Sequence, residues 1–162
     1  MSEFEDRIRD AIVRGQKRNE RQSAAQHKQE LNADELKRLH SKYRLVLSDH
    51  IEECMKKLPN YFPGFQFETL YGERGWGAAC SRDDIRLDGG KRDNMYSRLE
   101  LTVRPFSDLK VVDLAAKGTV LNKELLTRSH FMKIADVDEQ EFIGLIDRWV
   151  LEYVELYAAN QV

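Results

Sequence analysis

The sequence has little cysteine, no long apolar run and almost no net charge. Its 162 residues include two cysteines, Cys54 and Cys80, which are too few for a disulfide framework. We therefore expect reduced thiols, which are typical of cytosolic proteins. No apolar stretch approaches the roughly 18 residues that can span a bilayer. The N-terminus is charged from its third residue and lacks the apolar segment of a secretory signal. These absences predict a cytoplasmic protein without membrane contact.

The charge balance limits the class of partner. The formal net charge is -2 and the isoelectric point is about 6.1, whereas a whole-surface nucleic-acid binder is strongly basic. Charged residues make up 33% of the chain, above the usual quarter, so some segment must be solvated on most sides. The length fits one domain with an extension.

Catalytic and metal-binding motifs are also missing from the sequence. It contains no G-x-S-x-G, no H-E-x-x-H and no phosphate loop. His50 and Cys54 have the i, i+4 spacing of a metal-ligand pair, but no second pair follows. Free cysteine usually packs as a small hydrophobe, so the sequence predicts a structural role for this pair, no metal and no cofactor. An enzyme is not predicted, although 28 acidic residues always permit a catalytic carboxylate pair.

The first 31 residues predict a charged helical arm. Ser2 to Glu5 can form a capping box, and Phe4, Ile8, Ala11 and Ile12 follow at helical spacing. This apolar stripe then stops, and residues 14–30 contain no apolar side chain larger than alanine. Such a helix has nothing to bury, so it either projects into solvent, frays, or is ordered by a partner.

Two further helices are expected. One starts at Asn32 and ends near Leu58, before Pro59, although Asn32 could also lie inside one long helix. The other starts at the capping box Asp138 to Glu141. Its apolar face is the strongest periodic signal in the chain and consists of Phe142, Leu145, Ile146, Trp149, Tyr153, Leu156 and Tyr157.

Between these helices, the sequence predicts a sheet of four or five strands. Strands are expected at residues 65–71, from 76 towards 87, at 95–103 and at 109–116, with a loop at 88–94. The pattern between Cys80 and Ile85 suggests a bulge, and residues 118–134 could form a fifth strand or a short helix. Consecutive strands favour antiparallel pairing. We therefore predict an α+β protein: a single domain at residues 32–162 with an antiparallel sheet against both helices, preceded by the arm at residues 1–31.

Candidate binding residues come from three regions. Trp76 lies between glycines at a hairpin end, where it could be an interface anchor beside Arg74 or point into the core. Two further arginines could line a pocket between sheet and helices, and three lie on the arm. The full set of candidates is Arg74, Trp76, Arg98, Arg104, Arg14, Arg18 and Arg21.

These features favour a non-enzymatic binding, adaptor or chaperone-like protein that acts through protein–protein contacts, most simply as a homodimer. One alternative is a small-ligand-binding protein or an enzyme with a pocket between sheet and helices. A second alternative is nucleic-acid contact through the basic residues of the arm. The arm carries seven basic and six acidic side chains, and this near balance argues against nucleic acid.

Overall fold

The computed structural model describes residues 3–160, without the side chains of residues 25–32. The chain divides into two compact units, residues 1–38 and 39–162. The elements in chain order are α1 (Glu3–Met55), α2 (Leu58–Tyr61), β1 (Gln66–Leu70), β2 (Trp76–Asp88), β3 (Lys91–Val103), β4 (Val111–Val120), β5 (Lys123–Lys133), a 3-10 turn (Ile134–Asp136) and α3 (Glu139–Ala159).

Most of the first unit is the N-terminal portion of α1. All side chains of residues 3–24 are exposed, as expected for a segment whose apolar stripe stops after four positions. An ion pair between Glu3 and Arg7, one helical turn apart, supports the first turns. The cap expected at Ser2 lies outside the described residues. Residue 32 lies inside α1, so the helix does not begin there.

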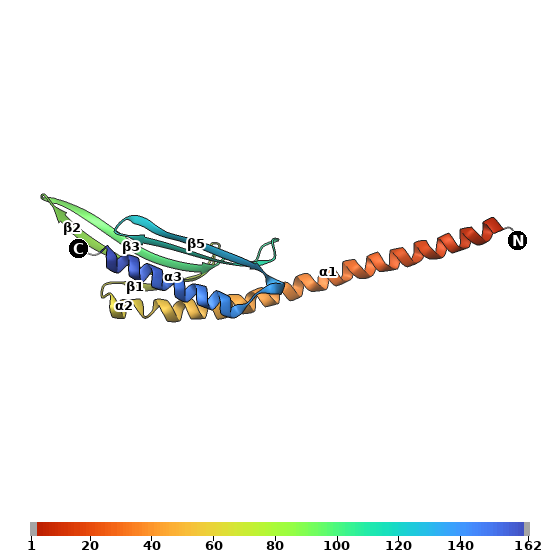
Figure 1. Cartoon of the computed structure of the whole chain (residues 1–162), viewed down its shortest axis with the longest axis horizontal. Helices are drawn as coiled ribbons and strands as arrows, with labels where there is room; N and C mark the ends of the chain where they lie inside the picture. The colour runs from red at the N-terminus through yellow and green to blue at the C-terminus, as the bar shows by residue number, and fades with distance from the viewer. Residues whose placement is uncertain (1–2, 161–162) are drawn as a thin grey trace. The chain divides into compact units, whose positions relative to one another are not determined.

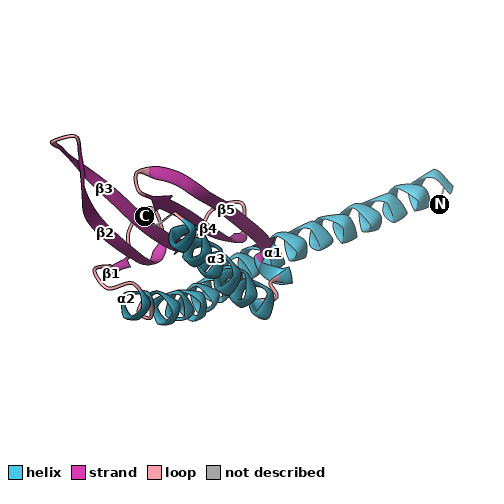
Figure 2. Cartoon of the chain, turned by 60° about the vertical axis from the view of Figure 1, so that its left-hand side comes forward, coloured by secondary structure: helices cyan, strands magenta, loops and turns pink. Residues whose placement is uncertain are grey.

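The second unit contains an antiparallel sheet whose five strands follow one another in the order β1-β2-β3-β4-β5 (Figure 1). This confirms the predicted α+β class. Residues 39–55 of α1 and the whole of α3 cover one face of the sheet, as Figure 2 shows. Tyr153 of α3 donates its hydroxyl to the Thr119 carbonyl at 2.7 Å, and the Cys80 thiol donates to the Met55 carbonyl at 3.1 Å. Both helical segments therefore contact the same core.

The core consists of the alternate strand residues that face the helices, together with the apolar helix faces. Asp138 caps α3 as predicted, because its carboxylate accepts from the backbone N–H groups of Gln140 and Glu141. The largest fully buried side chains are Tyr153, Tyr157, Phe142, Leu47, Ile51, Met55, Leu99, Leu101, Leu114, Leu126, Ile134 and Ile146.

The β2–β3 hairpin corrects two expectations. β3 begins at Lys91, so the turn is only Gly89-Gly90, and both glycines have the positive φ that a tight hairpin turn requires. The β2–β3 register runs without a shift from Trp76 to Asp88, so the bulge expected after Cys80 is wrong. Cys80 and Ile85 are five residues apart in a regular strand, so their side chains lie on opposite faces of the sheet. No bulge is needed to explain this, because the hairpin extends beyond the core and the outward-facing Ile85 is exposed.

Other element boundaries also differ from expectation. α1 ends at Met55, and Pro59 lies in the first turn of the separate helix α2, where proline is favoured. β4 extends to Val120, and the segment left open by the sequence forms β5. The β4–β5 register shifts between Gly118 and Thr119. Within residues 3–160, no helix combines the length and apolarity needed to cross a membrane.

Candidate functional site

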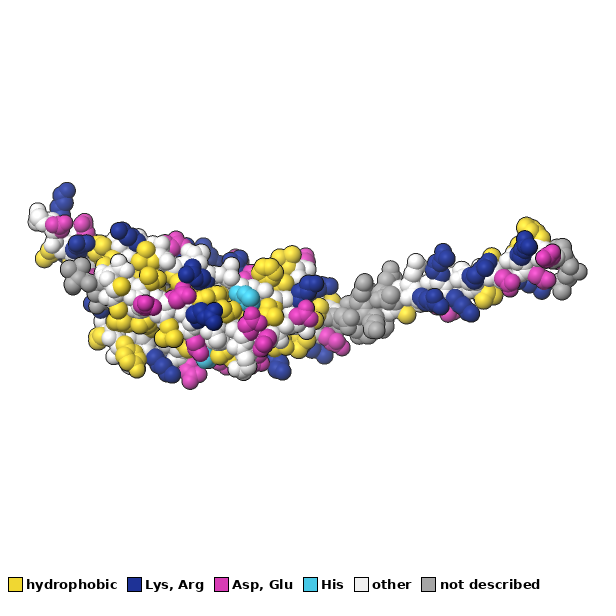
Figure 3. Space-filling model, in the orientation of Figure 1, with side chains coloured by type: hydrophobic (Ala, Val, Ile, Leu, Met, Phe, Trp, Pro, Cys, Tyr) yellow, Lys and Arg dark blue, Asp and Glu magenta, His cyan; other side chains and the backbone are white. Residues whose placement is uncertain are grey.

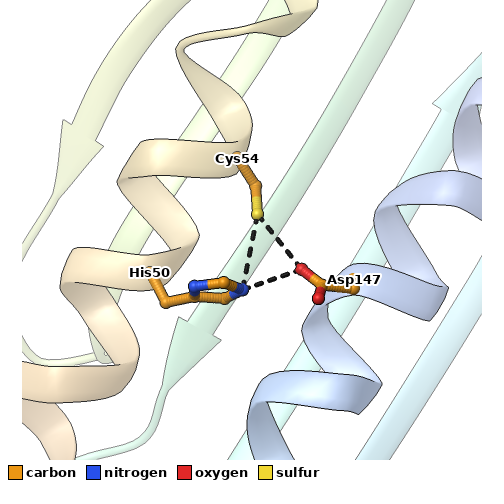
Figure 4. A group of neighbouring side chains, drawn as sticks. All are labelled: His50, Cys54 and Asp147. Carbon is orange, nitrogen blue, oxygen red and sulfur yellow. Dashed lines mark hydrogen bonds and ion pairs between the residues drawn. The ribbon is translucent and has the colours of Figure 1, made fainter.

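A cluster of three potential metal ligands lies where α1 approaches α3 in the second unit (Figure 4). His50 and Cys54 come from successive turns of α1, and Asp147 comes from α3. The Asp147 Oδ1 atom lies 2.7 Å from His50 Nε2 and accepts from the Cys54 thiol at 3.4 Å. The Cys54 Sγ atom lies 3.6 Å from the same His50 Nε2. All three donor atoms therefore face one point.

This geometry does not fit a nucleophilic relay. In a Cys–His–carboxylate relay, the nucleophile and the carboxylate contact opposite nitrogens of the imidazole ring. Here both Cys54 and Asp147 approach Nε2 of His50. Burial and the hydrogen bond to Asp147 also raise the pKa of Cys54 to about 11, so at neutral pH it is a thiol and a weak nucleophile. The arrangement is suited to sharing a cation rather than to covalent catalysis.

An apolar groove of about 490 Å³ adjoins the cluster. Cys54 and Asp147 line one part of it, so the groove and the cluster share two side chains. Tyr61 and Leu151 are among its lining residues and are largely exposed. The volume lies within the range of small-molecule pockets.

A second hollow, of about 760 Å³, lies on the sheet face away from the helices and contains Arg74 and Arg104. Its lining residues come only from strands and loops. The Arg104 Nε atom lies 3.4 Å from an oxygen of Asp113, which also lines the hollow. These two predicted binding residues are thus brought together on the open face of the sheet, not beneath the helices.

Arg98 lies on the same sheet face but is held by two carboxylates. Its guanidinium contacts Glu68 at 2.7 Å and Glu100 at 3.2 Å. These contacts connect β1 and β3 across β2 and neutralise the positive charge. The geometry therefore gives Arg98 a structural role in the sheet.

Trp76 occupies the edge of the core and remains 38% exposed. The Arg44 guanidinium carbon lies 3.6 Å from its ring centroid, and the Tyr71 ring centroid is 6.5 Å away. Trp76 is therefore neither a freely exposed interface anchor nor a core residue, since its ring is covered by Arg44 but not enclosed.

The arm residues Arg14, Arg18 and Arg21 are exposed and belong to the first unit. Figure 3 shows Lys and Arg side chains along this helix, with Asp and Glu side chains towards its beginning.

No protein-family description, curated protein or solved structure matches the chain. The cluster must therefore be interpreted from its own geometry. The sequence showed the His50 and Cys54 spacing but gave no local signal for Asp147, which lies 93 residues after Cys54.

Proposed function

We propose that the protein is a non-enzymatic binding protein that self-associates through the N-terminal portion of α1. The observation that carries this proposal is the exposed apolar stripe of Phe4, Ile8 and Ile12, of which Phe4 is 69% exposed. Each of these side chains follows the previous one by four residues, so they lie within one face of the helix. A helix of this kind gains most of its stability from burying such a face, so a covering surface is expected.

The charges beside the stripe favour a second copy of the chain as that surface. Residues 3–10 contain four carboxylates and two arginines, whereas residues 11–24 contain four basic side chains and one glutamate. Two antiparallel copies would place the acidic portion of each beside the basic portion of the other. Opposite charges in this arrangement select the orientation as well as stabilising it.

A pairing centred on Ile12 aligns particular charges along the helix axis. In that register residue i lies at the same height along the axis as residue 24 − i of the other copy, so Arg14 is level with Asp10, Arg18 with Asp6, and Arg21 with Glu3. At 3.6 residues per turn these six charges occupy a sector of about 120° whose centre lies about 140° around the axis from the centre of the stripe. They therefore attract one another across the helix pair at long range and do not form direct contacts in the apolar seam. Arg18 lies nearest to the stripe, about 40° around the axis from Phe4, so its aliphatic stem would also cover the partner's apolar side chains.

The expected affinity is modest. Burying an exposed Phe or Ile contributes about 1–2 kcal/mol, and the stripe offers three such side chains per copy, so a pair gains about 6–12 kcal/mol. Association costs about 4–15 kcal/mol in lost freedom. Towards the lower end of that cost a few kcal/mol remain, which corresponds to a dissociation constant on the order of millimolar. The free thiols of Cys54 and Cys80 are consistent with a cytoplasmic location for this dimer.

Sedimentation equilibrium over a micromolar-to-millimolar concentration series tests the proposal. The wild-type chain should form dimers, and the double variant Arg14→Glu, Arg18→Glu should remain monomeric. Adding Asp6→Arg and Asp10→Arg to that variant reverses both members of each pair and should restore the dimer. The matched control Lys91→Glu, Arg92→Glu changes the charge equally at the exposed β2–β3 hairpin and should dimerise like the wild type.

Two results would overturn the proposal. One is a wild-type chain that stays monomeric throughout the series. The other is a dimer that the Arg14→Glu, Arg18→Glu variant leaves unchanged. If the wild-type chain stays monomeric and binds RNA or DNA with an affinity that falls with added salt and is lost in the Arg14→Glu, Arg18→Glu variant, the arm is a nucleic-acid contact instead.

A further inference from the structure

We propose that His50, Cys54 and Asp147 form a zinc site with an open fourth coordination position. All three residues belong to the second unit, so the inference does not depend on self-association of the arm. It goes beyond the structural role that the sequence predicts for His50 and Cys54.

The donor set selects the metal. Zinc is bound in proteins by cysteine sulfur, histidine nitrogen and carboxylate oxygen, and the cluster supplies one donor atom of each kind. Magnesium and calcium prefer oxygen ligands alone, so a thiolate and an imidazole disfavour them. His50 and Cys54 are one turn apart on α1, which makes their side chains converge.

The distances are close to those of a tetrahedral zinc site. Ordinary zinc–ligand bond lengths and tetrahedral angles place sulfur about 3.5 Å from both nitrogen and oxygen, and nitrogen about 3.3 Å from oxygen. The observed separations are 3.6 Å for sulfur to nitrogen and 3.4 Å for sulfur to oxygen. The nitrogen-to-oxygen separation of 2.7 Å is that of a hydrogen bond and must widen by about 0.6 Å. The cluster is therefore nearly preformed for the ion.

The site is open enough for an ion to enter. The side chain of Asp147 is 51% exposed and that of His50 is 24% exposed, so a small movement of the aspartate can widen the short separation. Zinc would replace the thiol proton of Cys54, which is released to solvent, and leave a thiolate bound to the metal. Three protein ligands leave the fourth position to water or to an added ligand, and the apolar groove beside Cys54 and Asp147 offers space for one.

The experiment measures zinc and cobalt binding by the full chain. Competition with a chromogenic chelator should give one zinc per chain, and cobalt should produce a thiolate-to-cobalt charge-transfer band with tetrahedral d–d absorption. The single variants His50→Gln, Cys54→Ala and Asp147→Asn should each weaken zinc binding by about 100-fold or more, since second-shell changes alone cost 10- to 100-fold. Cys54→Ala should also abolish the charge-transfer band.

Two control variants retain the cluster while removing the same kinds of side chain elsewhere. Cys80→Ala removes the other thiol, and His130→Gln removes a histidine that faces α3 through Glu141. Both should bind zinc like the wild type, with folding checked by circular dichroism. Zinc at about 100 times its dissociation constant should raise the wild-type Tm by about 5–10 °C and leave that of Asp147→Asn unchanged.

Several outcomes would refute the site. Zinc binding by the wild type no tighter than by Asp147→Asn shows that the cluster is only a hydrogen-bonded contact between α1 and α3. A charge-transfer band that survives Cys54→Ala but disappears in Cys80→Ala shows that Cys80, and not Cys54, binds the metal. If excess azide leaves the cobalt spectrum unchanged, the fourth position is not open, and that part of the proposal fails.

Discussion

Replacing Arg44 and Trp76 together should show whether Trp76 is held as part of the structure. Trp76 lies on the helix-facing side of β2, and the Arg44 guanidinium covers its ring at 3.6 Å. Cation–π contacts contribute about 0.5–1 kcal/mol at exposed sites and about 2 kcal/mol when desolvated. Trp76 is 38% exposed, so we expect a coupling free energy of about 1 kcal/mol.

The measurement is a double-mutant cycle of Arg44→Gln and Trp76→Leu, with equilibrium urea unfolding followed by far-ultraviolet circular dichroism. Trp76→Leu alone should lower the free energy of unfolding by about 1–3 kcal/mol, because the ring is more than half buried and leucine replaces part of its contact. Arg44→Gln alone should lower it by about 1 kcal/mol. The double variant should lose less than the sum of the two single losses.

Lys42→Gln gives a matched control, because Lys42 is an exposed cation on the same helix. Its effect and that of Trp76→Leu should add to within about 0.5 kcal/mol. If Arg44 and Trp76 are also additive within that error, the stacking contributes nothing to stability. Trp76 would then be free to act as an interface anchor, and the structural interpretation of this contact would be wrong.

Two further predictions concern stability. Burial and the neighbouring Arg44 lower the pKa of His40, so below about pH 6.5 the unfolded chain binds more protons than the folded chain. The free energy of unfolding should therefore fall between pH 7 and about pH 5.5 more steeply in the wild type than in His40→Gln; equal slopes in urea titrations would refute this. Gly118→Ala would place a Cβ atom 2.7 Å from the Tyr153 ring, so it should destabilise the fold by about 1–3 kcal/mol. Gly144→Ala, on α3, would place its Cβ within 4 Å of no atom beyond its chain neighbours and the nearby backbone of its own helix, so it should instead stabilise the fold by about 0.5–1 kcal/mol. A similar Tm for both variants would contradict the packing argument.

The sequence predicts those parts of the fold in which one periodic face meets the core. The apolar face of α3 and the cap at Asp138 are examples, because both depend on residues within a few turns of one another. The same reasoning fails at the end of the β2–β3 hairpin. There the strands extend past the core, so apolar side chains such as Ile85 are exposed and the alternation of apolar and polar residues no longer reports which side chains are buried.

For a related reason, the sequence reveals two of the three residues of the candidate site. The spacing of His50 and Cys54 is a local property of a helix, so it can be recognised in the sequence. Asp147 is placed beside them by the packing of α3 against α1, and it follows the buried Ile146 on the flank of the apolar face. Other carboxylates of α3, such as Glu152, occupy similar positions in the sequence pattern. Glu152 instead pairs with Arg128 of β5, which only the tertiary structure reveals.

The composition of the cluster could also suggest catalysis, and its geometry decides against that interpretation. Cysteine, histidine and aspartate can form a relay only when the imidazole transmits a proton between its two nitrogens. In this protein, Cys54 and Asp147 both approach Nε2 of His50, so the ring cannot connect them in series. The same convergence brings a sulfur, a nitrogen and an oxygen atom to one point, which is what a metal ion requires. Identical residue types thus support opposite chemistry, depending on which ring nitrogen the neighbours share.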